Sequence, residues 1–173
     1  MNRNWNKDWR KSIIIMSGGF DPIHKGHLRM FREASWLGHH VVVGLNSDDW
    51  LTRKKGKPFM DFEERKEIIE GFKYVNQVIP FDDSDDTASD LIRRVHSIYD
   101  GEEFDHHYVD DEHMGMVDYY QIYFANGGDR GKGNVPELDV CKELGVTMLW
   151  GVGGGKIQSS SWLINGGKDE VQE

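Results

Sequence analysis

The chain has 173 residues, a formal charge of −9 at pH 7, 12% aromatic residues and a single cysteine. This length suits a single domain, which we place at residues 1–173 with an N-terminal arm at 1–11. The acidic balance argues against nucleic acid or a membrane surface as a partner. The lone Cys141 allows no intramolecular disulfide and fits a reducing compartment. The apolar run at 13–16 is too short for a signal peptide or a membrane span, so we expect a cytoplasmic protein.

Residues 12–34, SIIIMSGGFDPIHKGHLRMFREA, predict a strand, a glycine turn and a helix. The apolar run Ile13–Met16 breaks at glycine, and helical spacing of apolar residues extends over 26–37. A helix N-terminus offers unpaired N–H groups and a positive dipole end, which favour phosphate. His24 and His27 are three residues apart, so they face the same side of the first turn. They can therefore donate hydrogen bonds to charge that develops on phosphate oxygens.

The next elements are a short strand, a basic segment and a helix. Val41–Leu45 is rich in β-branched residues, and Asp61 followed by Glu64 is typical of the start of a helix, which we extend to about Gly71. Between them, we expect residues 46–60 to form a polar loop that is basic, although the chain as a whole is acidic. We interpret it as a mobile loop that neutralises a phosphate group when it closes, through Arg53, Lys54, Lys55 and Lys57.

The remainder alternates strand and helix patterns. We expect strands at 75–81, 121–125 and 146–150, and helices at 87–99, at 136–144 and from about Ser159. This alternation predicts an α/β fold, a Rossmann-like parallel sheet with helices on both faces. Ligands of such sheets bind beyond the carboxyl ends of the strands, where the glycine turn lies.

Two segments carry acidic residues outside this pattern. The carboxylates of the run DDSDD at 82–86 are placed to interact with the positive end of the helix that follows. The run lacks the residue spacing of an EF-hand, so we assign no calcium site to it. Residues 101–120 contain histidines and carboxylates but no cysteine, and their spacing fits no closed zinc site. We interpret residues 101–120 as an inserted loop and assign no metal-ligating residue.

The turn GGFDPIHKGH resembles the HxGH-type signature of the cytidylyltransferase-like nucleotidyltransferases. The matching residues are Gly18, Gly19, Phe20, Asp21, His24, Gly26 and His27. The resemblance implies that this turn binds the triphosphate of CTP or ATP and that the two histidines stabilise nucleotidyl transfer to a substrate phosphate. A dinucleotide-dependent oxidoreductase would instead need a G-x-G-x-x-G turn after the first strand, which GGFDPIHKGH does not supply.

The resemblance continues along the chain to about residue 164. The KGKP segment implies a catalytic lysine, which we assign to Lys57 with its neighbour Lys55 as the alternative. The helix that follows implies an arginine, Arg65, that forks onto phosphate oxygens. The segment NGGDR implies an aspartate near the nucleotide, Asp129.

A glycine- and serine-rich stretch near the C-terminus implies a second anion-binding turn, formed by Lys156, Ser159, Ser160 and Ser161. Family members with sugar or polyol substrates often have an arginine shortly before this turn. This chain has Gly154 or Gly155 there, and Lys156 is the nearby cation.

Together these features predict transfer of CMP from CTP to a small phosphorylated polyol or sugar, with pyrophosphate released and Mg²⁺ carried by the nucleotide. The resemblance extends equally to heptose-1-phosphate adenylyltransferases, so ATP and a sugar phosphate stay open as substrates. A third interpretation is a non-catalytic domain that binds nucleotide without releasing pyrophosphate. The resemblance also implies a homodimer.

Overall fold

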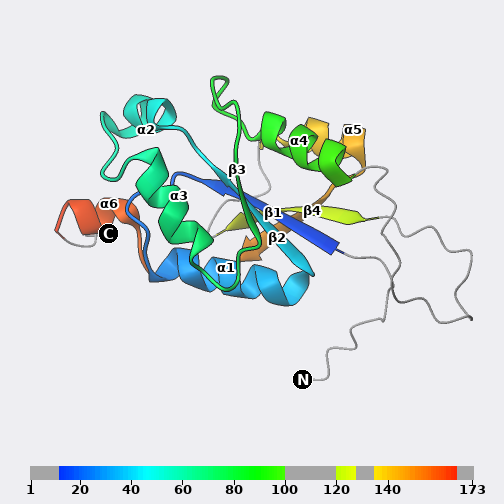
Figure 1. Ribbon diagram of the computed structural model, residues 1–173, viewed down its shortest axis with the longest axis horizontal. Coiled ribbons are helices and arrows are strands. Elements are labelled where there is room, and N and C mark those ends of the chain that lie inside the picture. Colours follow the sequence, from blue (N-terminus) through cyan, green and yellow to red (C-terminus); the bar gives the residue numbers. More distant parts are fainter. Residues whose placement is uncertain (1–11, 100–119, 128–134, 167–173) are drawn as a thin grey trace, which may run out of the picture.

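The computed structural model describes residues 12–99, 120–127 and 135–166. Within these residues lies a five-stranded sheet of order β3-β2-β1-β4-β5, in which every neighbouring pair is parallel (Figure 1). The strands are β1 Ser12–Gly18, β2 His40–Leu45, β3 Gln77–Pro80, β4 Gln121–Gly127 and β5 Thr147–Val152. The predicted Rossmann-like parallel sheet is confirmed.

Helices cover both faces of this sheet (Figure 1). They are α1 Lys25–Leu37, α2 Asp48–Lys55, α3 Phe62–Glu70, α4 Ser89–Tyr99, α5 Leu138–Leu144 and α6 Ser160–Ile164. Because side chains alternate along a strand, Ile13 and Ile15 of β1 belong to a core with α4 and α5, whereas Ile14 and Met16 belong to a core with α1 and α3. The central strand is therefore buried on both faces, which fixes its carboxyl end and the turn that follows.

The basic segment at residues 46–60 differs from the predicted loop, because most of it forms the helix α2. Ser47 begins this helix, and its Oγ accepts a hydrogen bond from Trp50 N at 3.0 Å. Acidic residues fill the first turn and basic residues the last, an order that complements the helix dipole. The expectation of a mobile loop is thus wrong for α2.

The other expected elements are present with shifts of a few residues at their ends. The N-terminal arm, and all of the predicted insertion except Tyr120, lie outside the described residues. Among the helices that the structure describes, none has the length and apolar character needed to cross a membrane. The carboxyl ends of β1, β4 and β5, together with the N-terminus of α1, bound the site considered next.

Candidate active site

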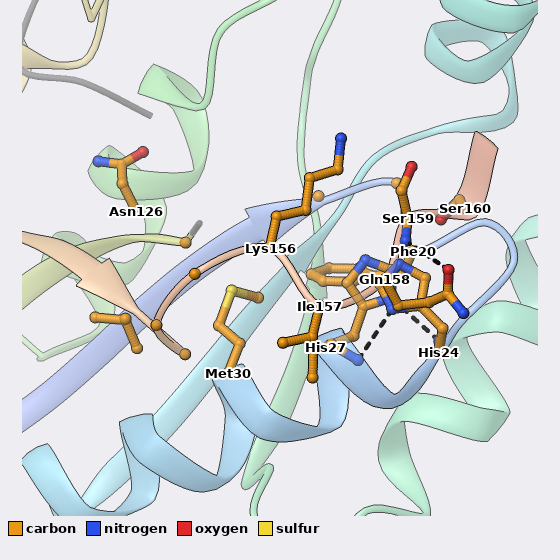
Figure 2. Close-up of a pocket in the computed structure, with 18 of the residues that line it drawn as sticks. Phe20, His24, His27, Met30, Asn126, Lys156, Ile157, Gln158, Ser159 and Ser160 are labelled. Carbon is orange, nitrogen blue, oxygen red and sulfur yellow. Dashed lines mark hydrogen bonds between the residues drawn. The ribbon is translucent and has the colours of Figure 1, made fainter. Parts of the chain in front are cut away.

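A cavity of about 390 Å³ lies at the carboxyl edge of the sheet (Figure 2). It is bounded by the turn after β1, the start of α1, the ends of β4 and β5, and the loop that leads into α6. Two lysines and two histidines line it, and none of its described lining residues is a carboxylate. In a chain with a net charge of −9, such a lining favours an anionic ligand.

Most residues predicted to form the site are brought together in this cavity. Those that line it are Gly18, Gly19, Phe20, His24, Gly26, His27, Lys156, Ser159, Ser160 and Ser161. They come from two segments more than a hundred residues apart in the chain, the turn between β1 and α1 and the loop between β5 and α6. Asp129 lies outside the described residues, so its contact with a nucleotide stays a prediction.

His24 and His27 stack at the N-terminus of α1, with ring centroids 3.7 Å apart and ring planes inclined by 17°. Nδ1 of His24 accepts a hydrogen bond from Gly26 N at 3.1 Å, and Nδ1 of His27 accepts one from His24 N at 3.3 Å (Figure 2). A backbone N–H can only donate, so each neutral ring carries its own proton on Nε2. Each imidazole therefore keeps one N–H donor for a ligand oxygen.

Both imidazoles are held neutral at pH 7. Burial is the main cause that lowers the pKa of His27 to about 3, and the charges of His24 and Lys55 add to it. Burial also lowers the pKa of His24, against the opposing effect of its backbone hydrogen bond, and Lys55 contributes to the lowering. The pair thus offers hydrogen-bond donors without a fixed charge, which suits charge that develops only in a transition state.

Glycines of the turn make room for aromatic rings. A Cβ on Gly26 would lie 2.9 Å from Cε1 of His24, and a Cβ on Gly18 would lie 2.9 Å from Cζ of Phe20. Phe20 itself has a φ of 48° and contacts the ring of His27 edge-on, with centroids 4.9 Å apart. The absence of a side chain at Gly26 and Gly18 therefore makes room for the rings of His24 and Phe20, and Phe20 in turn packs against His27.

Of the two lysines considered for the KGKP segment, Lys55 lines this cavity, whereas Lys57 is exposed beyond the end of α2 and does not line it. Nζ of Lys55 donates a hydrogen bond to the carbonyl oxygen of Asp21 at 2.8 Å, beside the turn that holds the histidines. Partial desolvation lowers the pKa of Lys55; the charge of Asp21 opposes this and that of Arg65 adds to it. Of the predicted Lys57 and its alternative Lys55, the structure brings only Lys55 to the cavity, and a catalytic role for it stays a prediction.

Arg65 does not reach the cavity, because its side chain is fully buried. Nε donates to the Met60 carbonyl at 3.1 Å, and Nη1 donates to those of Gly19 and Asn46 at 2.8 and 2.9 Å. Nη2 donates to a carboxylate oxygen of Asp48 at 2.6 Å. Since every guanidinium nitrogen is bound within the protein, the predicted fork onto phosphate is corrected: Arg65 is a positioning residue.

Asp21 is also buried and holds the site together from outside the cavity. Its carboxylate accepts hydrogen bonds from Phe59 N at 2.8 Å and from Met60 N at 2.7 Å. These bonds tie the HxGH turn to the segment before α3. The predicted contact between Asp21 and a nucleotide is therefore corrected, because the carboxylate is bound by the protein backbone.

The loop between β5 and α6 is joined to the HxGH turn. The Ser160 hydroxyl donates to the carbonyl oxygen of Pro22 at 2.9 Å, and the hydroxyls of Ser159 and Ser161 lie 2.7 Å apart. Nζ of Lys156 lies 4.9 Å from the centroid of the Trp162 ring. This wall of the cavity supplies hydroxyl groups and a second ammonium group (Figure 2).

Sequence reasoning missed another part of the cavity, which Met30, Asn126, Gly127 and Gly153 line. Figure 2 shows Asn126 well apart from His24. Asn126 is 3% exposed, and its Nδ2 has no hydrogen-bond partner within the structure described. A signal for it existed, because Asn126 ends an apolar strand pattern and precedes two glycines, as ligand-binding residues at the carboxyl end of a strand do.

A parallel α/β sheet with a basic cavity at its carboxyl edge, lined by a stacked histidine pair, defines a Rossmann-like protein with an anion site. The profile of the cytidylyltransferase-like family matches residues 15–130, and the chain belongs to this family.

Curated relatives match over part of their lengths. Glycerol-3-phosphate cytidylyltransferase of Bacillus spizizenii is 32% identical over 110 residues, which cover 64% of this chain and 79% of that enzyme. The enzyme of the same name from Bacillus subtilis is 34% identical over 79 residues, 46% of this chain and 61% of the relative. Bifunctional protein HldE of Coxiella burnetii is 33% identical over 87 residues, 49% of this chain and 18% of that protein.

Solved structures share the fold. The lipopolysaccharide core biosynthesis protein of Thermoplasma volcanium aligns with a TM-score of 0.53 at 22% identity, over 81% of this chain and 93% of that one. The bifunctional NMN adenylyltransferase/ADP ribose pyrophosphatase of Francisella tularensis aligns with a TM-score of 0.58 at 15% identity, over 90% of this chain and 42% of that one. At these identities the likeness shows a common fold.

The buried position of Arg65 predicts a large effect on stability. We expect Arg65→Met to lower the free energy of unfolding by about 3–5 kcal/mol, because the Asp48 carboxylate and three backbone carbonyls lose their donor. Urea denaturation followed by circular dichroism measures this loss. Arg32→Met, which alters an exposed arginine of α1, is the control. A stable Arg65→Met variant with only a raised KM for nucleotide would contradict the positioning role.

The low pKa of His27 predicts that stability depends on pH. Below pH 6.5 the unfolded chain binds a proton at His27 that the folded chain, with a pKa of about 3, does not bind. The free energy of unfolding therefore falls as the pH decreases, by about 1.4 kcal/mol between pH 7.5 and 5.5 for this one group. In His27→Asn, Oδ1 can accept the hydrogen bond from His24 N, but the side chain does not titrate. Between pH 7.5 and 5.5 its free energy of unfolding, measured by urea denaturation, should therefore fall by about 1.4 kcal/mol less than that of the wild type. Equal pH dependence of the two proteins would contradict the neutral state of His27.

Proposed function

We propose that this protein is a nucleotidyltransferase that transfers CMP from CTP to a small phosphorylated polyol or sugar. An ionised oxygen of the acceptor phosphate attacks the α-phosphorus of CTP and forms a new P–O bond. The bond between that phosphorus and its bridging oxygen breaks, and pyrophosphate leaves with the electron pair. The observation that carries this proposal is the stacked pair His24 and His27, two neutral donors in a cavity without a described carboxylate.

The roles of the side chains follow from their charge. The acceptor phosphate is ionised at pH 7 and needs no general base, so the site has to align the reacting atoms and stabilise negative charge. The Nε2–H groups of His24 and His27 hydrogen-bond the α-phosphate and the bridging oxygen as charge develops on them. Lys55 and Lys156 balance the charge of the remaining phosphates, and the hydroxyl of Ser159 hydrogen-bonds one of their oxygens.

We propose that Mg²⁺ reaches this site bound to the triphosphate. Magnesium sites commonly combine substrate phosphates and water with one or two carboxylates. The described lining of the cavity contains none, and the neighbouring Asp21 already binds two backbone N–H groups. A metal ion held by the nucleotide fits this donor set, and it would neutralise triphosphate charge alongside Lys55 and Lys156.

The choice of CTP rests on the relatives. Glycerol-3-phosphate cytidylyltransferase of Bacillus spizizenii aligns over 64% of this chain, whereas bifunctional protein HldE of Coxiella burnetii aligns over 49% at a similar identity. This difference favours a cytidylyltransferase with a phosphorylated polyol as acceptor. ATP and a sugar phosphate are the alternative that the assay below separates.

Pyrophosphate release tests the proposal directly. We expect release in the presence of Mg²⁺, CTP and one member of a panel of phosphorylated polyols and sugars, and no release when the acceptor is omitted. The product is identified by mass spectrometry as the acceptor joined to CMP. Release with ATP in place of CTP would assign an adenylyltransferase. Saturable nucleotide binding without release across the panel would support a binding domain and contradict the proposal.

A pair of substitutions at His27 separates its two nitrogen atoms. His27→Asn keeps an acceptor near the position of Nδ1 but loses the Nε2–H donor, so we expect kcat to fall by about 10²–10³-fold, as for loss of one preorganised donor. His27→Gln places an amide N–H near the position of Nε2 and should retain more activity. Nucleotide KM should change little in either variant. The control is His39→Asn, an exposed histidine outside the cavity, and unchanged kcat in His27→Asn would remove His27 from the mechanism.

A further inference from the structure

The acidic run at residues 82–86 contacts α2, a role that its sequence did not suggest. The carboxylate of Asp83 accepts hydrogen bonds from Asn46 Nδ2 at 3.0 Å, from Ser47 N at 2.7 Å and from Ser47 Oγ at 2.7 Å. Asp83 is 4% exposed, and Ser47 is the N-cap residue of α2. A buried carboxylate with three donors thus fixes the residue at which α2 begins.

The same acidic run also binds the other end of α2. Nη2 of Arg53 donates to the carbonyl oxygen of Asp83 at 2.6 Å and to the carboxylate of Asp86 at 3.3 Å. Nζ of Lys54 donates to the second carboxylate oxygen of Asp86 at 3.2 Å. Two of the three consecutive basic residues of α2 are therefore paired, and neither lines the cavity.

These contacts determine the direction of the third basic residue. Consecutive residues of an α-helix point about 100° apart around its axis. Because Arg53 and Lys54 are bound on the side of the acidic run, the rotation of α2 is fixed. Lys55 then extends toward the HxGH turn, where its ammonium meets the carbonyl oxygen of Asp21 and lines the cavity.

We propose that Asp83 and Asp86 are positioning residues, which hold α2 at both ends so that the Lys55 ammonium faces the phosphate site while Arg53 and Lys54 are kept away from it. The inference rests on the proposed function, because it assigns Lys55 a triphosphate ligand. This positioning role explains why the basic end of α2, which lies next to an anion site, also contacts the acidic run at residues 82–86. Because Arg53 and Lys54 are paired with the acidic run, only Lys55 of these three cations faces the site. The carboxylates that form the pairs stay outside the described lining of the cavity.

Protection of Lys55 from acylation tests the inference without an activity assay. The intact protein is treated with a limiting amount of an amine-reactive ester, with and without inorganic tripolyphosphate, and acylation is quantified lysine by lysine by mass spectrometry. In the wild type we expect tripolyphosphate to slow acylation of Lys55 about tenfold and to leave Lys66 of α3 unchanged, as one charge-assisted contact predicts. In Asp83→Asn and Asp86→Asn this protection should fall to about twofold or less.

Matched variants separate positioning from stability. Asp85→Asn makes the same change in the same run, but its carboxylate bonds only to Thr87 among the described residues, so protection should stay as in the wild type. Asp86 is exposed, so its replacement should leave urea denaturation nearly unchanged even if Asp83→Asn folds poorly. Asp86→Glu, which keeps the charge, should restore protection.

The outcomes distinguish this inference from the proposed function. Wild-type protection that persists unchanged in Asp86→Asn and in folded Asp83→Asn would overturn the positioning role and leave the triphosphate site intact. Absence of protection in the wild type would overturn both the role of Lys55 and the proposed function. Protection lost in Asp85→Asn as well would show a general effect of charge and overturn the inference.

Discussion

A single buried guanidinium group joins the loops that carry this site. Removing such a charge from water costs several kcal/mol unless its N–H groups are satisfied, and Arg65 satisfies them with three backbone carbonyls and one carboxylate. The carbonyls belong to the turn after β1, the segment after β2 and the segment before α3. Their positions are therefore coupled, so the histidine turn and the start of α2 keep a fixed geometry relative to each other.

Carboxylates extend this principle around the cavity. Asp21 binds two N–H groups before α3, Asp83 binds the N–H of Ser47, and Glu33 of α1 accepts from Gly153 N at 3.0 Å. Each of them fixes a loop by its backbone and stays out of the described lining. An acidic protein can in this way build a basic pocket, because its nearby negative charges are occupied by N–H donors a short distance behind the surface that a ligand would meet.

Local signals explain what the sequence predicted. The apolar run at 13–16 and the glycine turn after it determine a strand and the start of a helix through neighbouring residues alone, and the alternation of such patterns predicts a parallel sheet. The helix α2 escaped prediction because only Leu51 on it is buried, so it has no apolar stripe. Its start depends on Asp83, 36 residues from Ser47 in the chain.

The same distinction applies to the site residues. The sequence does not distinguish a charged motif residue that binds a ligand from one that is buried and hydrogen-bonded to backbone groups. Arg65 and Asp21 are buried and bound to backbone groups, and these contacts come from segments up to 46 residues away in the chain. The choice between Lys55 and Lys57 likewise depends on where α2 ends, since Lys55 is its last residue and Lys57 follows Gly56. The histidine pair could be predicted from local signals, because both members lie within one helical turn and directly follow a strand and a glycine turn.

The cavity separates two electrostatic tasks between two kinds of side chain. In the function that we propose, Lys55 and Lys156 provide positive charge in every state of the reaction, so they contribute to binding a triphosphate before transfer as much as during it. His24 and His27 stay neutral because burial and the nearby ammonium oppose their protonation. Their N–H groups gain most as negative charge grows on the oxygens they face, and only an interaction that is stronger in the transition state accelerates a reaction. In the proposed function, the burial that lowers stability at low pH is thus the same feature that keeps the histidines neutral until negative charge develops in the transition state.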